Sequence, residues 1–343
     1  MLDQAREVLA REEAWVVGGA VRDELLGREL VDVDIACSRP EEAARAFQER
    51  AGGAVFPLSE RHGAWRVAFR DGRTVDFTPL PDAGIEPDLA TRDFTINAIA
   101  RPLAGGDHVD PFGGRSDLDA RRLRAVSDGV FEDDPLRLLR AVRFEQQLGF
   151  MLDEETERLA HEHASLVTRP AGERILGELV QVEPASFRRL DELGLLEPLG
   201  GSLVRLDRVE GREPGPLVLV SVFGDSLSKL PISRELARYA RILLRAELPP
   251  DTSARAIHRF RRATEPWSLD ALVLLGGSQD LTTAVEDARA NEPPEPLVRG
   301  DELGLPPGPE IGRLLDLIEE ERAAGTISTR DEAFELARKE VKR

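Results

Sequence analysis

The fold of the N-terminal part is decided by the stretch Trp15-Val-Val-Gly-Gly-Ala-Val-Arg-Asp-Glu-Leu-Leu-Gly-Arg-Glu-Leu-Val-Asp-Val-Asp-Ile35. The apolar run before the two glycines is typical of the end of a strand, and the glycines permit a tight turn because neither has a Cβ. Residues 20–26 have helical spacing, and Gly27 lies where a helix would end. Residues 31–35 alternate apolar and acidic side chains, as a strand does. We therefore expect a strand, a glycine turn, a helix and a second strand.

The two acidic residues of this stretch, Asp32 and Asp34, project from the same face of the second strand. Carboxylates held that close repel each other unless a cation lies between them. Mg²⁺ takes oxygen ligands and leaves room for substrate phosphates, and a glycine turn before a helix supplies backbone N–H donors for a phosphate. The stretch predicts a phosphate-and-metal site, with a solvated acidic strand face as the alternative.

The composition limits the classes of protein to be considered. The chain has 343 residues, of which 41% are hydrophobic, so two or more domains with apolar cores are expected. It contains no long uncharged apolar run, and its N-terminus lacks the pattern of a signal peptide. The single Cys37 suits a reducing cytoplasm, which is the compartment we expect. The net charge of −18 argues against a protein that coats nucleic acid nonspecifically.

Three further strands are expected at residues 54–58, 64–69 and 74–78. The last of them contains Asp76, an acid flanked by apolar residues. It is either an outward-facing strand residue or a third carboxylate facing the first two, and two-metal sites profit from a third oxygen ligand. We include Asp76 among the expected catalytic residues.

A second dense motif covers residues 88–100. Arg92 and Asp93 open an apolar segment in which Asn97 is polar. A buried amide needs hydrogen-bond partners, so we expect Asn97 to be fixed by its neighbours.

A third dense motif covers residues 131–144, within a region where helical patterns replace strand patterns. Asp134 and Pro135 fit the N-cap and first positions of a helix. Asp134 and Arg137 then present an acceptor beside a donor fork, which can read the edge of a nucleobase. Arg140 and Arg143 continue the same stripe, for which a solvated basic ridge is the alternative.

In this order, the motifs resemble those of the class II tRNA nucleotidyltransferase and poly(A) polymerase family. Gly18-Gly-Ala-Val-Arg-Asp23 followed by Asp32-Val-Asp34 resembles its first motif, and Arg92-Asp-Phe-Thr-Ile-Asn-Ala98 its "RRDFTINA" motif, with Thr91 where many members carry an arginine. Residues 133–140 resemble "ED-xx-R-xx-R", and residues 172–178 resemble "ER-I-xx-E", which braces the preceding helix in the family.

The resemblance implies a fold class and a division into domains. We expect an α/β N-terminal nucleotidyltransferase head, polymerase-beta-like with a small mixed sheet, followed by an all-α neck, body and tail. The expected domains are a catalytic head (1–122), a neck with the nucleotide-selecting helix (123–180), a body (181–290) and a tRNA-binding tail (291–343).

The resemblance also implies an activity, namely adding or repairing the 3′-terminal CCA of tRNA from CTP and ATP without a nucleic-acid template. Asp32 and Asp34 would hold two Mg²⁺ ions, and Asp134 with Arg137 would select CTP and ATP over GTP and UTP. The remaining expected nucleotide-binding residues are Gly18, Gly19, Arg22, Arg92, Arg140 and Arg143. The expected partners are tRNA lacking its CCA end, CTP and ATP, with no membrane; no protein partner can be inferred.

Three alternatives remain. Many CCA-adding members have a longer flexible segment where this chain has the short, proline-containing residues 79–90, so an enzyme that adds only CC is a serious alternative. A poly(A) polymerase is less expected because the C-terminal tail is acidic. A non-catalytic RNA-binding module is opposed by the intact pair of Asp32 and Asp34.

The helical half contains one locally basic segment. Residues 231–265 carry eight arginines and four acidic residues. Such a segment could hold the tRNA backbone, and solvated arginines on a helix face are the alternative.

Overall fold

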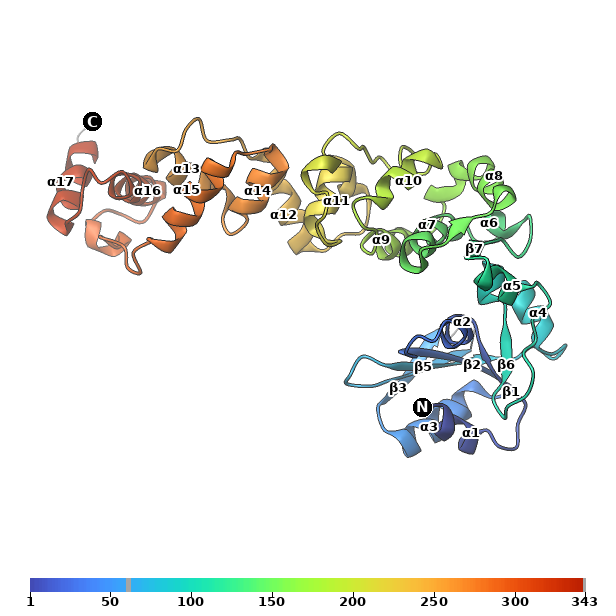
Figure 1. Cartoon of the computed structure of the whole chain (residues 1–343). Coiled ribbons are helices and arrows are strands. Elements are labelled where there is room, and N and C mark those ends of the chain that lie inside the picture. Colours follow the sequence, from blue (N-terminus) through green and yellow to red (C-terminus); the bar gives the residue numbers. More distant parts are fainter. Residues whose placement is uncertain (60–62, 342–343) are drawn as a thin grey trace. The chain divides into compact units, whose positions relative to one another are not determined.

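The computed structural model describes residues 1–59 and 63–341 (Figure 1). Its contacts divide the chain into two compact units. Unit 1 comprises Met1–Glu178 and Arg188–Leu199, and unit 2 comprises Leu179–Phe187 and Gly200–Arg343. The expected fold class is confirmed, because unit 1 contains a mixed sheet and the chain beyond it is helical. The finer division into head, neck, body and tail stays a prediction.

The sheet has six strands in the order β3-β4-β5-β2-β1-β6. Only β2 and β5 pair in parallel, and every other neighbouring pair in this sheet is antiparallel. The strands predicted from the sequence are confirmed, whereas β6, which forms the edge beside β1, was not foreseen. The bounds are β1 (Ala14–Val17), β2 (Asp32–Cys37), β3 (Ala54–Ser59), β4 (Ala64–Ala68), β5 (Thr74–Pro79) and β6 (Ala100–Pro102).

Helices cover both faces of this sheet. On one side, α3 (Pro40–Ala51) packs on the strands and on α1 (Leu2–Val8), and on the other lies α2 (Gly19–Leu25) (Figure 1). The inward side of α3 is formed by the predicted residues Ala43, Ala44 and Phe47, which are all buried. Central strand β2 is therefore covered on both faces, except where its N-terminal end reaches solvent at Asp32.

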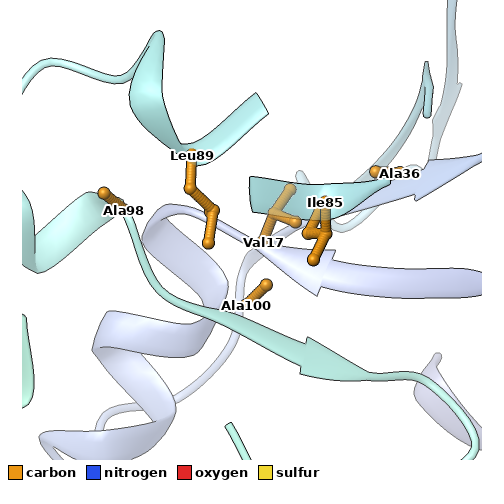
Figure 2. Packing of buried hydrophobic residues seen from close by; sticks show 6 residues of the cluster. All are labelled: Val17, Ala36, Ile85, Leu89, Ala98 and Ala100. Atoms are coloured by element: carbon orange, nitrogen blue, oxygen red, sulfur yellow. The ribbon is translucent and has the colours of Figure 1, made fainter. Parts of the chain in front are cut away.

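The short connection after β5 contains a helix that the sequence did not reveal, α4 (Ile85–Ala90). Ile85 and Leu89 lie on its inner side and pack against Val17 of β1 and Ala100 of β6 (Figure 2). Both side chains are almost completely removed from solvent. Residues 85–90 are therefore docked on the sheet rather than forming an open loop.

The rest of unit 1 is helical apart from a two-residue parallel pairing of β7 (Arg122–Leu123) with β8 (Met151–Leu152). The helix expected to start at Pro135 begins at Arg137. Asp134 has extended backbone geometry, and its carboxylate accepts a hydrogen bond from the Leu136 N–H, which forms a turn before the helix. The helices are α5 (Gly114–Asp119), α6 (Val130–Asp133), α7 (Arg137–Leu148), α8 (Glu154–Glu162), α9 (Gly172–Leu179) and α10 (Ser186–Glu192), the last two continuing across the boundary between the units.

Unit 2 is built from helices that bury apolar side chains. Helix α11 is buried from Leu217 to Phe223, and an apolar cluster joins Leu314 and Ile318 to Ala333 and Ala337. Within the described part of the chain, no helix has both the length and the apolar character needed to cross a bilayer. The helices are α11 (Pro216–Phe223), α12 (Arg234–Arg245), α13 (Ala254–Thr264), α14 (Ser268–Leu275), α15 (Gln279–Ala290), α16 (Pro309–Ala323) and α17 (Arg330–Val341).

The docking of α4 on the sheet can be tested with Leu89→Ala. Leu89 is fully buried, so the cavity left by this change should lower the free energy of unfolding of unit 1 by about 2–5 kcal/mol. Urea unfolding measures the change, with Trp15 and Trp65 of the sheet as fluorescence reporters. Leu58→Ala is the matched control, because Leu58 is 44% exposed and its loss should cost less than about 1 kcal/mol. Equal losses in the two variants would show that α4 is not docked.

Candidate active site

The turn between β1 and α2 depends on Gly18. Its φ is +66°, in the left-handed region. A Cβ at this position would lie 3.2 Å from Arg92 Nη1 and 3.5 Å from Asp34 Oδ2. A larger residue would therefore be both strained and crowded by two expected site residues. The close approach of the backbone at this turn agrees with the prediction from the two glycines.

A cleft of about 480 Å³ opens beside this turn. It brings together residues from all three dense motifs, which are far apart in the sequence. Of the residues predicted from the sequence, those that line it are Gly18, Gly19, Arg22, Asp32, Asp34, Arg92, Asp134, Arg137 and Arg140. Asp76 and Arg143 are not among the lining residues.

The two carboxylates of β2 lie in different environments. Asp32 is exposed and accepts a hydrogen bond from Thr74 Oγ1 at 2.7 Å. Asp34 is partly covered, and no donor within the described residues hydrogen-bonds to it. Burial raises the pKa of Asp34 to about 6 despite the opposing charge of Arg92, and the nearby Asp76 and Asp32 add to the rise. The negative charge of Asp34 is thus not fully compensated by nearby positive charges or hydrogen-bond donors.

Asp76 lies beside Asp34, since the two residues are partners in the parallel pairing of β2 and β5. Both of its carboxylate oxygens are nevertheless occupied, because Arg66 of β4 donates Nε and Nη2 to them at 2.7 Å each. The place of Asp76 among the catalytic residues stays a prediction, to which the structure adds this ion pair. No local pattern pointed to it, because Arg66 reaches Asp76 from the neighbouring strand.

Two carboxylates, rather than a complete protein ligand set, are available for a divalent cation. Among residues 1–59 and 63–341, no group of three or more His, Cys, Asp and Glu side chains is placed to hold a metal ion. Asp32 and Asp34 are a smaller donor set, and Asp34 offers oxygens that have no hydrogen-bond partner in the described chain. This set fits an ion such as Mg²⁺, which takes its remaining ligands from water and substrate phosphates.

The second motif is joined to α7 by one buried carboxylate. Asp93 accepts hydrogen bonds from the Phe94 N–H, from Asn97 Nδ2 at 2.9 Å and from Arg140 Nε and Nη2 at 2.9 and 2.6 Å. Burial alone would raise the pKa of Asp93, but the charge of Arg140 and these hydrogen bonds outweigh it and hold the pKa below its ordinary value. Asn97 also accepts from Arg22 Nη1 at 2.8 Å, so its predicted need for partners is confirmed.

The third motif differs from expectation in one detail. The Asp134 carboxylate is not hydrogen-bonded to the Arg137 guanidinium, but accepts two hydrogen bonds from Arg174 of α9 at 3.2 and 2.7 Å. Arg137 instead donates to the backbone carbonyls of Val130 and Thr91. Both side chains still line the cleft.

Residues 172–178, which resemble the "ER-I-xx-E" motif, brace α7, as predicted. Glu178 of α9 accepts from Arg143 Nε at 2.6 Å. This contact holds Arg143 away from the cleft, so it supports the helix rather than lining the site.

The sequence analysis missed a second buried carboxylate, Asp117 of α5. It is fully removed from solvent and accepts from Thr95 Oγ1, Arg122 and Arg124. It thereby anchors the second motif at Thr95. The sequence shows only acidic and basic residues close together in a glycine-rich turn, a pattern also typical of solvated loops.

Comparison with known proteins identifies the family. Residues 14–124 match the Poly A polymerase head domain. The chain is 32% identical to the A-adding tRNA nucleotidyltransferase of Deinococcus radiodurans, in an alignment that covers 93% of this chain and 94% of that protein. The chain belongs to the class II tRNA nucleotidyltransferase and poly(A) polymerase family. It is an enzyme of the nucleotidyltransferase class.

Other nucleotidyltransferases show the same likeness over different lengths. The CC-adding tRNA nucleotidyltransferase of Geobacter sulfurreducens is 46% identical over 180 residues, which cover 52% of this chain and 40% of that protein. The structure of the Thermotoga maritima CCA-adding enzyme complexed with tRNA has a TM-score of 0.76 at 23% identity, covering 99% of this chain and 94% of that chain. This structural likeness shows that the nucleotidyltransferase fold extends over the whole chain.

The contrast between Asp34 and Asp93 of this nucleotidyltransferase gives a prediction. Asp34→Asn should raise the free energy of unfolding at pH 7 by roughly 1–3 kcal/mol, because it removes a poorly compensated charge. The pKa of Asp34 in the fold, about 6, lies above its ordinary value of 3.8. The wild type therefore gains stability as the pH falls between these values, so the advantage of the variant should be largest above pH 6 and vanish below about pH 4. Urea unfolding in a chelating buffer measures it.

Asp93→Asn is the matched comparison, and it should lower the free energy of unfolding at pH 7 instead of raising it. The pKa of Asp93 is lowered in the fold, so its ionised form stabilises the protein above the ordinary carboxyl pKa and this contribution is lost in acid. Removing it at pH 7 leaves Arg140 with only the more distant carboxylate of Glu178, at 3.9 Å, and should cost about 3 kcal/mol. If the two variants changed stability in the same direction at pH 7, the two environments described above would be wrong.

Proposed function

We propose that this chain adds or repairs the 3′-terminal CCA of tRNA, using CTP and ATP and no nucleic-acid template. The observation that carries the proposal is the joining of three motifs in one cleft, where Asp32 and Asp34 lie with Asp134 and Arg137. The names of full-length relatives, which add C or A residues to tRNA, support it.

The triphosphate of the incoming nucleotide is assigned to the glycine turn. Gly18 and Gly19 allow it to approach the backbone, and Arg22 and Arg92 line the same part of the cleft. Arg92 holds Asp88 through Nε and Nη2, while its Nη1 lies near the turn. These guanidinium groups suit phosphate oxygens, because their planar fork donates two hydrogen bonds at once.

Asp32 and Asp34 would hold two Mg²⁺ ions, which, when bound, activate the 3′-hydroxyl of the tRNA and neutralise the triphosphate as pyrophosphate leaves. The support for this ligand set is the carboxylate of Asp34, which lines the cleft and whose charge is poorly compensated. Asp76, the register partner of Asp34, would be the third ligand of the set, since the two hydrogen bonds from Arg66 leave one lone pair on each of its oxygens.

The choice of nucleotide is assigned to Asp134 and Arg137. A carboxylate acceptor and a guanidinium donor can match the edges of cytosine and adenine. To do so, Asp134 has to exchange its hydrogen bonds with Arg174 for bonds with the base. Arg140, fixed by Asp93, holds the helix α7 that begins with Arg137 and follows the turn containing Asp134.

An enzyme that adds only the two C residues is the second candidate. One observation favours it: the short segment after β5 is a helix whose Ile85 and Leu89 are buried on the sheet. It lacks the freedom that the longer, flexible segment of many CCA-adding members provides.

As part of the same proposal we place the enzyme in the cytoplasm, with its single Cys37 buried and unpaired.

Nucleotide incorporation tests the proposal. With magnesium and a tRNA that lacks its CCA end, CTP alone should give two added residues, and CTP with ATP should give three. Addition of two residues under both conditions would show a CC-only enzyme. Addition of a single A, and only to a tRNA that already ends in CC, would show an A-adding enzyme, and long A tracts would show a polymerase. No incorporation with any nucleotide and tRNA would refute the proposed function.

The same assay tests the metal-binding pair. Replacing both Asp32 and Asp34 by Ala should lower the rate by roughly 10³-fold or more, without loss of the folded state in thermal unfolding. Asp71→Ala is the matched control, since Asp71 lies in an exposed turn outside the cleft and pairs with Arg73 of the same turn. An Ala variant of the Asp32 and Asp34 pair that kept the wild-type rate would refute the metal assignment.

A further inference from the structure

Helix α12 (Arg234–Arg245) carries a row of four arginines. They are Arg234, Arg238, Arg241 and Arg245, spaced by four, three and four residues. This spacing places them on one face of the helix. All four are exposed, and at a rise of about 1.5 Å per residue the row extends over about 16 Å.

The row faces away from the core of unit 2. Tyr239, Ala240 and Leu243 form the buried side of α12, about half a helical turn away from the arginines. Tyr239 is fixed there by a 2.8 Å hydrogen bond to Asp270 of α14. The orientation of α12, and with it the outward direction of the arginine row, is thus set by the core.

The other four arginines of the basic segment, which lie on α13, have a different fate. Each forms an ion pair within unit 2, and acidic residues of α16 supply most of the partners. The pairs are Arg255 with Glu320 and Glu321, Arg259 with Glu320, Arg261 with Glu265 and Glu292, and Arg262 with Asp316. The positive charge of α13 is therefore neutralised inside the fold.

The α12 row has no such neutralisation. Within residues 1–59 and 63–341, none of its four guanidinium groups lies within ion-pair distance of an Asp or Glu. Arg238 lies over the Trp267 ring at 5.4 Å. The sign of this row is opposite to the net charge of −18 of the whole chain. Four uncompensated charges in a row form a local positive surface that attracts a polyanion.

We propose that the α12 arginine row binds the phosphate backbone of a double-stranded part of the tRNA. This inference rests on the proposed function, which supplies the RNA substrate. A straight row of charges matches the regular spacing of phosphates along a nucleic-acid strand, and each guanidinium can hold a phosphate with two hydrogen bonds. The aromatic ring of Trp267 is covered by Arg238. The row would therefore contact phosphates and would not distinguish one base sequence from another.

Salt dependence of tRNA binding tests the row with two matched double variants of the full chain. One is Arg241→Gln with Arg245→Gln on α12, and the other is Arg259→Gln with Arg262→Gln on α13. Both remove two exposed arginines from the same basic segment, so they change the net charge equally. Fluorescence anisotropy with labelled tRNA lacking its CCA end gives the Kd at several NaCl concentrations.

For the α12 variant, the slope of log affinity against log salt should fall by between about 1 and 2, since each duplex phosphate contact contributes about 0.9. The Kd at low salt should rise about tenfold or more, with a higher KM for tRNA and an unchanged kcat, because the row binds ground and transition states equally. The α13 variant should keep the wild-type slope and a Kd within about twofold of the wild-type value.

An unchanged slope in the α12 variant, or equal changes in both variants, would overturn the inference. A third variant, Arg241→Lys with Arg245→Lys, separates a loss of charge from a loss of structure. It keeps both charges and should keep the wild-type slope, so a slope as low as that of the glutamine variant would also overturn the inference.

The failure of this inference can be told apart from the failure of the proposed function. If the wild type extends tRNA while both glutamine variants bind it normally, the role of the row is refuted and the proposed function stands. If the wild type extends no tRNA at all, the proposed function itself fails.

Discussion

One buried carboxylate, that of Asp93, holds together the cleft to which we assign the reaction. It lies between the sheet and α7 and accepts hydrogen bonds from Phe94, Asn97 and Arg140. A carboxylate is removed from water only at a high cost, which its ion pair and hydrogen bonds must offset. Because the lowest cost requires all partners at once, the Asp93 site specifies one position of α7. That position puts the carboxylates of β2 and the polar groups before α7 on the same cleft.

The acidic residues around this cleft lie in two kinds of environment. The difference distinguishes residues that stabilise the fold from a residue that we assign to the reaction. Asp93 and Asp117 are buried with enough donors to stay ionised, and the pKa of each lies below its ordinary value. Asp34 is covered without enough donors, and its pKa is raised to about 6. A fold gains nothing from such a group, so its cost to stability is typical of a site arranged for a ligand. The contrast supports the assignment of Asp34 to the chemistry and of Asp93 to its support.

The sequence was most informative where local pattern decides the structure. The glycine turn, the alternating strand of Asp32 and Asp34 and the buried side of α3 follow from steric freedom and periodicity, which act over a few residues. Partners from elsewhere in the chain could not be predicted in this way. Helix α4 forms in a segment with Pro87 because Ile85 and Leu89 find a place on the sheet. Asp76 is taken by Arg66 from the neighbouring strand, and the arginines of α13 are neutralised largely by acids of α16, more than 50 residues later. A count of charges along the segment cannot distinguish these arginines from those of α12.

The central claim is that one cleft holds both the metal-bound triphosphate and the base that is selected. A crystal structure with a non-hydrolysable CTP analogue and Mn²⁺ in place of Mg²⁺ tests it most directly. We expect anomalous density for manganese at Asp32 and Asp34, with the cytosine edge against Asp134 and Arg137 and with Arg174 withdrawn from Asp134. A nucleotide bound outside this cleft, with Asp32 and Asp34 free of metal, would contradict the account.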